Sequence, residues 1–160
     1  MTAGQSIADY TLAFNLFKAV TDNDGFAGQG HPLVFVTDDS LAEQTALHDV
    51  WPESNLHLCL FHVLHAVWRW LWDTKHSIDQ EDRKTLMQSF QQLVRSTTEG
   101  EAVELYASGL DEDSLWNKYP QWCQYVESYW ERRQMWCMAW QHNSTMGHST
   151  DNFCESTIRL

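Results

Sequence analysis

The clearest indication of fold in this 160-residue chain is the segment Leu33-Val34-Phe35-Val36-Thr37-Asp38-Asp39-Ser40. Its first four residues form a continuous apolar run with β-branched side chains, which predicts a buried parallel strand. Ser40 and Glu43 have the spacing of a capping box, which predicts a helix over residues 41–50. A second short run, residues 56–60, predicts another strand. The order strand, helix, strand indicates an α/β fold.

Helical patterns lie on both sides of this segment. Over residues 7–20, apolar side chains recur at spacings of three and four, which predicts an amphipathic helix. A glycine-rich loop is expected to lead from Thr21 to the first strand. Beyond the second strand, helical periodicity predicts a mainly helical block over about residues 60–141. A last helix is predicted to open at Thr150 or Asp151.

Composition and charge narrow the class of protein. With 22 acidic and 10 basic residues, the formal net charge is −12, which opposes nonspecific binding to DNA. A hydrophobic content of 43% with nine tryptophans indicates a packed, globular chain. No apolar run approaches the roughly 18 residues that a membrane span needs, and no signal peptide is recognised. The four cysteines lack a paired framework, so reduced thiols are expected.

Two acidic sites lie far apart in the sequence. Asp38 and Asp39 directly follow the predicted strand, where α/β proteins place ligands and catalytic groups. Glu155 stands at the opening of the last predicted helix. Carboxylates in such places can hold divalent cations against phosphate, so the pair of sites indicates metal-dependent phosphoryl transfer. The structural alternative is that residues 37–40 only cap a helix and that Glu155 only complements a helix dipole.

The segment Leu58-Cys59-Leu60-Phe61-His62-Val63 contains a Cys-x-x-His spacing, which suits one half of a zinc site. His142 and His148 offer a second half downstream. His57 and His65 flank the first pair and compete with it as ligands. The alternative is that all of these are polar side chains around the helical block, without a metal.

Eight of the nine tryptophans lie within the predicted helical block. Packing in a helical core is favoured for them over stacking on nucleic-acid bases. Trp68 is assigned to one apolar helical face together with Leu60, Val63, Leu64, Val67 and Leu71. The eight tryptophans are Trp68, Trp70, Trp72, Trp116, Trp122, Trp130, Trp136 and Trp140.

Four segments, in their order and spacing, resemble the transposase domain of Mutator-like elements (MULEs). They are Val36-Thr37-Asp38-Asp39, Trp51-Pro52-Glu53-Ser54, residues 58–63, and Ser149-Thr150-Asp151-Asn152-Phe153-Cys154-Glu155-Ser156. The resemblance runs from about residue 5 to the last residue. It implies a ribonuclease H-like core with a large helical insertion between the second and third acidic residues of a DDE triad.

The family's functional residues carry over by position. Asp38 resembles the second acidic residue and Glu155 the third, and their separation of 117 residues leaves room for the insertion. Cys59 and His62 resemble the family's Cys-or-Asp-x-x-His motif. The order of His142 and His148 is similar to that of the zinc ligands in the related V(D)J recombinase.

By this resemblance, residues 1–160 are a partial catalytic domain. Its core segments are expected at about 5–60 and 149–160, and its helical insertion at about 60–141. The first strands of the family's core, and the first catalytic Asp, find no counterpart here. The chain therefore resembles a nuclease-type phosphoryl transferase but is expected to be a fragment that is inactive on its own.

The resemblance also implies cofactors and partners. Mg²⁺ or Mn²⁺ is expected at Asp38 and Glu155, and Zn²⁺ at the Cys-x-x-His pair with its two downstream histidines. The implied partner is DNA at transposon ends, which this acidic chain is expected to bind weakly. The implied location is the nucleus, and no association with a membrane is expected. Formation of a homo-oligomer is a further expectation that the sequence leaves undecided. The alternative is a noncatalytic domain, domesticated from a transposase, that takes part in DNA or protein interactions.

Overall fold

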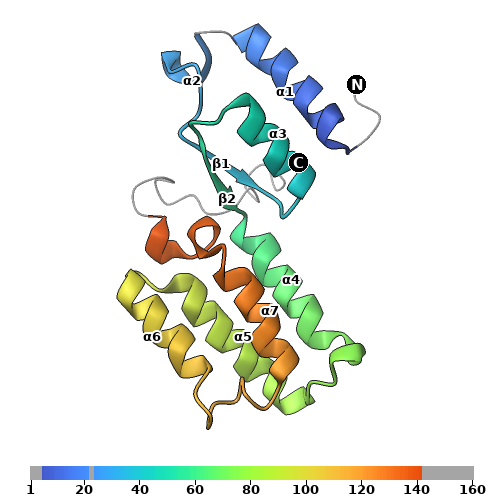
Figure 1. Cartoon of the computed structure of the whole chain (residues 1–160), viewed down its shortest axis with the longest axis vertical. Helices are drawn as coiled ribbons and strands as arrows, with labels where there is room; N and C mark the ends of the chain where they lie inside the picture. The colour runs from blue at the N-terminus through green and yellow to red at the C-terminus, as the bar shows by residue number, and fades with distance from the viewer. Residues whose placement is uncertain (1–4, 22–23, 142–160) are drawn as a thin grey trace, which may run out of the picture. The chain divides into compact units, whose positions relative to one another are not determined.

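The computed structural model describes residues 5–21 and 24–141, which divide into two compact units between Cys59 and Leu60. The elements of the first unit are labelled in Figure 1. They are α1 (Ile7–Thr21), α2 (Gly25–Gly28), β1 (Val34–Thr37), α3 (Leu41–Val50) and β2 (Asn55–Leu58). This order of helices around a small sheet is the α/β pattern that the sequence predicts.

The two strands form a parallel sheet, with α3 as the connection between them (Figure 1). Their register pairs Val34 with Asn55 and Thr37 with Leu58. Parallel strands need a crossover connection, and a helix is the usual one. Polar groups that follow β1 and β2 therefore lie at one edge of the sheet.

Trp51 is the centre of the first unit's core. Its indole is 3% exposed and lies at the end of α3, where it packs with Leu47 and Val50. Phe35 of β1 lies 5.2 Å from Trp51, and Phe14 of α1 lies 6.0 Å from it, both measured between ring centroids. Aromatic rings at such separations contribute packing beyond the apolar area that they bury. Trp51 thus links α1, α3 and the sheet.

Two local predictions need correction. The second strand ends at Leu58, and Leu60 already begins a helix, because the last hydrogen bond between the two chain segments joins Cys59 to Thr37. The expected loop after α1 contains the turn α2, in which Phe26 and Ala27 have φ of 55° and 60°. These are left-handed values, so α2 is a tight turn and not an ordinary helix.

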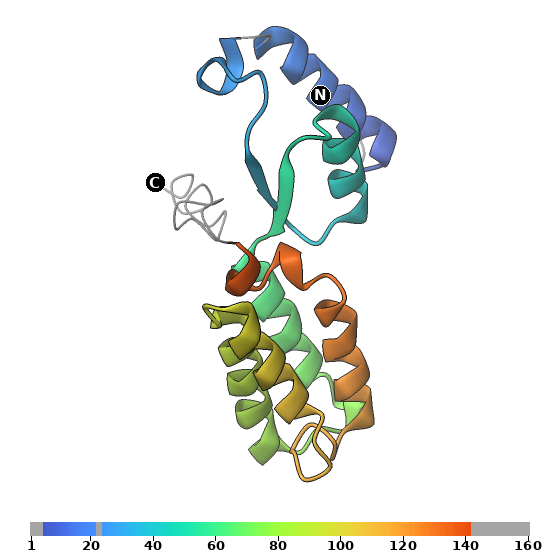
Figure 2. The same ribbon diagram turned by 60° about the vertical axis from the view of Figure 1, so that its left-hand side comes forward.

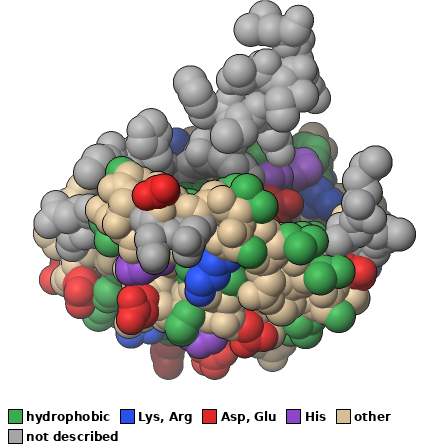
Figure 3. Space-filling view, turned by 90° about the horizontal axis from the view of Figure 1, so that it is seen from above, with side chains coloured by type: hydrophobic (Ala, Val, Ile, Leu, Met, Phe, Trp, Pro, Cys, Tyr) green, Lys and Arg blue, Asp and Glu red, His purple; other side chains and the backbone are tan. Residues whose placement is uncertain are grey.

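α1 forms as predicted, but it buries less than an amphipathic helix usually does. None of its residues is fully buried, and Val20, assigned to its apolar face, is 85% exposed. Leu12 and Leu16 are also more than half exposed. Figure 3 shows that several hydrophobic side chains lie at the surface. Only the side of α1 that carries Phe14 packs on the core around Trp51.

The second unit is helical throughout its described part, as the periodicity predicts. Its core comes from one face of each helix together with buried tryptophans, Trp116, Trp122 and Trp136. The helices α4, α5, α6 and α7 run alongside one another (Figures 1 and 2). The four α-helices are α4 (Leu60–Trp72), α5 (Gln80–Arg95), α6 (Glu99–Gly109) and α7 (Pro120–Trp130). Three short 3₁₀ helices, η2 (Thr74–His76), η3 (Arg133–Met135) and η4 (Met138–Trp140), also belong to the described part of this unit.

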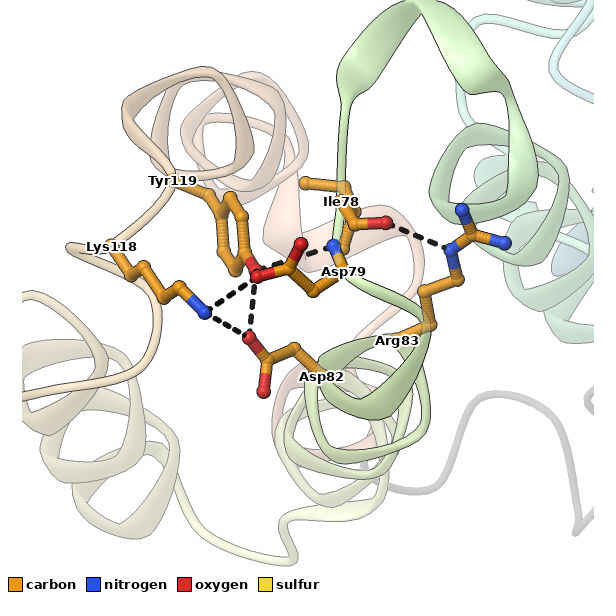
Figure 4. A network of polar contacts seen from close by, with 6 residues as sticks. All are labelled: Ile78, Asp79, Asp82, Arg83, Lys118 and Tyr119. Carbon is orange, nitrogen blue, oxygen red and sulfur yellow. Dashed lines mark hydrogen bonds and ion pairs between the residues drawn. The ribbon is translucent and has the colours of Figure 1, made fainter.

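A polar network ties the start of α5 to the loop before α7 (Figure 4). Lys118 Nζ lies 2.8 Å from Asp79 Oδ2 and 2.7 Å from Asp82 Oδ2. The Tyr119 hydroxyl lies 2.6 Å from the same Asp82 oxygen and accepts from the Asp79 main-chain N–H at 3.3 Å. These hydrogen bonds hold the pKa values of both aspartates below their usual range, with Lys118 as the main cause and Tyr119 next.

Within residues 5–21 and 24–141, none of the helices combines the length and apolar character that crossing a membrane requires.

Candidate functional site

The carboxyl edge of the two-stranded sheet carries the first acidic site. β1 ends at Thr37, and Asp38 and Asp39 follow directly, both exposed. In α/β proteins this edge is where ligands bind, since loops leave the strands there. The structure therefore places Asp38 at the end of a strand, as the sequence predicts.

The main chain at Asp38 is fixed by two donors. The Thr37 hydroxyl donates to the Asp38 carbonyl oxygen at 2.9 Å, and Gln44 Nε2 of α3 donates to the same oxygen at 3.0 Å. A carbonyl held from both sides restricts the backbone that carries the carboxylate. Such pre-positioning is what a ligand-binding side chain needs.

The N-cap of α3 is Ser40, not one of the aspartates. Ser40 Oγ accepts from the Glu43 main-chain N–H at 3.4 Å, and Ser40 has the extended backbone of a cap residue. This is the half of the capping box that the sequence predicts. Capping by Ser40 agrees with the structural alternative for residues 37–40, in which this segment caps α3.

Cys59 lies at the same edge of the sheet as Asp38. Its main-chain N–H donates to the Thr37 carbonyl oxygen at 2.8 Å, and its side chain is fully buried. His62 lies in the first turn of α4, three residues beyond Cys59, and belongs to the second unit. The Cys-x-x-His motif thus spans the point where the chain leaves the sheet and enters the helical unit.

The two histidines beside this motif have different surroundings. His57 lies in β2, is 6% exposed, and its Nδ1 has no hydrogen-bond partner among the described residues. Burial lowers the pKa of His57. His65 is exposed on α4 and stacks on Phe61 and Trp68.

Three of the expected site residues, His142, His148 and Glu155, lie outside the described residues. Among residues 5–21 and 24–141, no group of three or more His, Cys, Asp and Glu side chains is arranged to hold a metal ion. Asp38, Cys59 and His62 are therefore the expected site residues that the structure describes.

A cavity of about 320 Å³ lies at the opposite edge of the sheet. Its walls include residues 29–31, just before β1, and residues 51–53, just before β2. His31 Nε2 lies 3.3 Å from Glu53 Oε2 there. The Trp51-Pro52-Glu53-Ser54 segment is tied down locally, since Ser54 Oγ donates to the Pro32 carbonyl oxygen at 2.6 Å. This segment precedes β2, so it lies at the edge of the sheet opposite to Asp38.

The tryptophans divide into packed and exposed ones. Trp116, Trp122 and Trp136 are buried, as the core-packing interpretation predicts. Trp68 and Trp72 do not fit it, since they are 45% and 39% exposed on α4. The assignment of Trp68 to the apolar face of its helix is therefore wrong. The signal that could have shown this is the spacing of four, three and four residues along Phe61, His65, Trp68 and Trp72.

Residues 5–66 match the family model described as MULE transposase domain, which confirms over these residues the family that the motifs resemble. They include β1, α3 and β2 with Asp38, and the Cys-x-x-His segment with the start of α4. Comparison with curated proteins and with solved structures found no match.

Proposed function

We propose that this chain is part of a transposase that cleaves and joins DNA by metal-dependent phosphoryl transfer, since residues 5–66 match the MULE transposase domain model. The observation that carries the proposal is Asp38, an exposed carboxylate at the carboxyl end of β1 whose main-chain carbonyl is held by Thr37 and Gln44. A carboxylate at a strand end suits a hard cation.

The proposed catalytic ligands are Asp38 and Glu155. Mg²⁺ or Mn²⁺, when bound, would activate the attacking oxygen and stabilise the leaving oxygen of the phosphodiester. The donor chemistry at Asp38 fits such an ion, because adjacent Asp39 adds a second exposed carboxylate at the same edge. Asp38 binds and orients, and α3 holds its backbone in place through Gln44.

The proposed fold around this site is a ribonuclease H-like core, with the helical second unit as an insertion. In support, β1, α3 and β2 form a parallel βαβ unit, and helices follow from Leu60 onwards. The chain position of Glu155, beyond the helical unit, suits a return of the chain to the core. Only two of the three carboxylates of the triad are assigned in this chain, because the first has no counterpart. We therefore propose that the 160-residue chain by itself does not cleave DNA.

The proposed zinc site consists of Cys59, His62, His142 and His148. Its support is the place of Cys59, a buried thiol at the edge of the sheet, directly before α4. A thiolate and imidazoles are the ligands that zinc prefers. Such a site would join the two ends of the helical unit. Nuclear DNA is the proposed partner, and the net charge of −12 makes metal ions important for contacts to phosphate.

A Mn²⁺ titration of the 160-residue chain, followed by the electron paramagnetic resonance of the free ion, tests the catalytic site. Loss of a second-shell group weakens metal binding 10- to 100-fold, so Asp38→Asn, which alters a direct ligand, should weaken it by at least about tenfold. Asp49→Asn is the matched control, since Asp49 is an exposed carboxylate at the far end of α3. Equal Mn²⁺ affinity for Asp38→Asn and the wild type would overturn the proposal.

Zinc binding is tested separately by native mass spectrometry of the purified chain. One Zn²⁺ per chain is expected, and Cys59→Ser should lose it. Cys123→Ser is the control, because Cys123 lies in α7 and is not part of the motif. A wild-type chain without zinc, or a zinc that Cys59→Ser retains, would contradict the site.

The noncatalytic alternative is favoured by one observation, the acidic balance of the chain. A domesticated interaction domain would bind no Mn²⁺ at Asp38, and the same titration would detect this.

A further inference from the structure

One side of α4 carries a row of exposed, stacked rings. The aromatic face consists of Phe61, His65, Trp68 and Trp72. Successive ring centroids are 5.9, 6.2 and 5.1 Å apart, and the interplanar angles are 5°, 6° and 21°. Residues spaced four, three and four apart share one side of a helix. The four rings therefore form a continuous ladder more than three turns long.

The aromatic face points away from the core of its unit. The opposite side of α4 is buried through Val63, Val67 and Leu71. Phe61 and Trp68 are each 45% exposed, although neither is needed to fill the core. Large aromatic side chains that stay in water along one line are typical of a binding surface.

Cations lie beside this face. Arg83 of α5 places its guanidinium carbon 5.8 Å from the centre of the Trp72 ring. Arg69 is exposed on α4, next to Trp68 in sequence and one helical turn from His65. An arginine beside aromatic rings can contact a phosphate while the rings contact a base.

The charge near the aromatic face differs from that of the chain as a whole. Residues 60–95 hold five Lys and Arg residues against four Asp and Glu residues, whereas the whole chain stands at −12. Three of these four acidic residues are engaged by lysines: Asp73 by Lys75 at 2.8 Å, and Asp79 and Asp82 by Lys118 at 2.8 and 2.7 Å. This part of the surface therefore does not repel a polyanion as the rest does.

We propose that the aromatic face of α4 is a stacking platform for single-stranded DNA, with Arg69 and Arg83 placed for its phosphates. The choice of DNA as the partner depends on the proposed function of the chain as a transposase. The platform is a site separate from Asp38. Flat ring faces stack on unpaired bases, whereas in a duplex the base faces are covered by neighbouring pairs. Two arginines and several rings give a site where stacking, more than charge, sets the affinity.

Fluorescence anisotropy of a labelled 20-residue oligo-dT with the 160-residue chain tests this site in metal-free buffer. Stacking energies predict that Trp68→Leu or Trp72→Leu weakens binding roughly 5- to 150-fold. Trp68→Phe should keep most of the affinity, because it retains a flat ring, while leucine retains only the apolar bulk. Val103→Ala, an exposed apolar site on α6, is the control and should bind as the wild type does.

Salt dependence gives a second readout. With two phosphates contacted, the logarithm of the association constant should fall with the logarithm of salt concentration at a slope of about −1.4. An unlabelled duplex of the same length, and heparin as a polyanion without bases, should compete poorly. Circular dichroism of each variant confirms that the helical unit is folded.

Several results would overturn the proposal. They are no binding by the wild type, equal binding by Trp68→Leu, and equal competition by heparin. Self-association of the free chain that Trp68→Leu abolishes would assign the face to protein docking instead. Oligo-dT binding is measured without metal and Mn²⁺ binding without oligonucleotide, so the platform and the catalytic site succeed or fail independently.

Discussion

The main-chain N–H of Cys59 donates to the carbonyl oxygen of Thr37 at 2.8 Å, one residue beyond the paired strands. This bond brings two motifs that are far apart in the sequence to the same edge of the sheet. Asp38 follows Thr37, and the Cys-x-x-His segment starts at Cys59. One hydrogen bond therefore holds the backbone beside the proposed catalytic carboxylate, Asp38, next to Cys59, the first residue of the proposed zinc site.

The Ser40 cap should make a measurable contribution to stability. Ser40→Ala removes the side-chain acceptor of the Glu43 N–H. We expect the free energy of unfolding to fall by about 1 kcal/mol, the usual effect of losing an N-cap. Urea denaturation followed by circular dichroism measures this. Ser128→Ala, at an exposed site within α7, is the control, and an equal loss there would contradict the assignment of the cap.

His57 should titrate below the usual histidine value of about 6.5, because burial disfavours its charged form. A histidine whose pKa is lower in the folded than in the unfolded state stabilises the fold at pH values above its unfolded-state pKa. This contribution is lost as the pH falls through the two pKa values. The free energy of unfolding should therefore decrease as the pH falls below about 6.5.

NMR titration of the His57 ring protons checks the pKa directly. In His57→Gln, the loss of stability on acidification should be smaller than in the wild type. A His57 resonance that titrates at or above the usual value would contradict the predicted burial effect.

Two glycines of α6 should respond oppositely to the same substitution. A Cβ on Gly109 would stand 2.5 Å from a ring carbon of buried Trp116, whereas a Cβ on Gly100 would meet open space. Gly109→Ala is expected to destabilise the chain by on the order of 1–3 kcal/mol through overpacking. Gly100→Ala should be neutral or stabilise by up to about 1 kcal/mol through helix propensity. Thermal denaturation of both variants decides, and equal effects would rule out the close contact.

Lys118→Met should lower stability at neutral pH but not in acid. Lys118 holds the pKa values of Asp79 and Asp82 below their usual range. Carboxylates with lowered pKa values stabilise the folded state at pH values above their unfolded-state pKa, near 3.8. The contribution is lost as the pH falls through the folded values, so the wild-type and variant melting temperatures should converge below about pH 3. A constant difference down to pH 2 would contradict the role of the ion pairs. Lys84→Met, at an exposed site on α5, is the control.

Local sequence signals predicted the elements well. β1 and α3 follow from the apolar run before Thr37 and from the Ser40 and Glu43 spacing, both of which act over a few residues. The end of β2 was predicted two residues late, because Cys59 and Leu60 are apolar and suit a strand or a helix equally. Which one forms depends on where pairing with β1 stops, at Thr37.

The position of side chains relative to the core was harder to predict. Trp68 looks like a core residue by hydrophobicity and spacing, yet it is exposed on α4, and Val20 of α1 is exposed in the same way. A helical pattern defines a face only to within a broad sector, and the neighbouring elements decide which part of that sector is covered.

The α/β order, the helical character from Leu60 onwards, the motif pattern of the family and the place of Asp38 at a strand end all follow from the sequence alone. These depend on local periodicity, capping and residue identity. Three other relations required the folded structure: Asp38 and Cys59 share one edge of the sheet, Trp51 links α1 to the strands, and α4 exposes Trp68 and Trp72. Such relations depend on pairing and packing between distant segments, which no local pattern specifies.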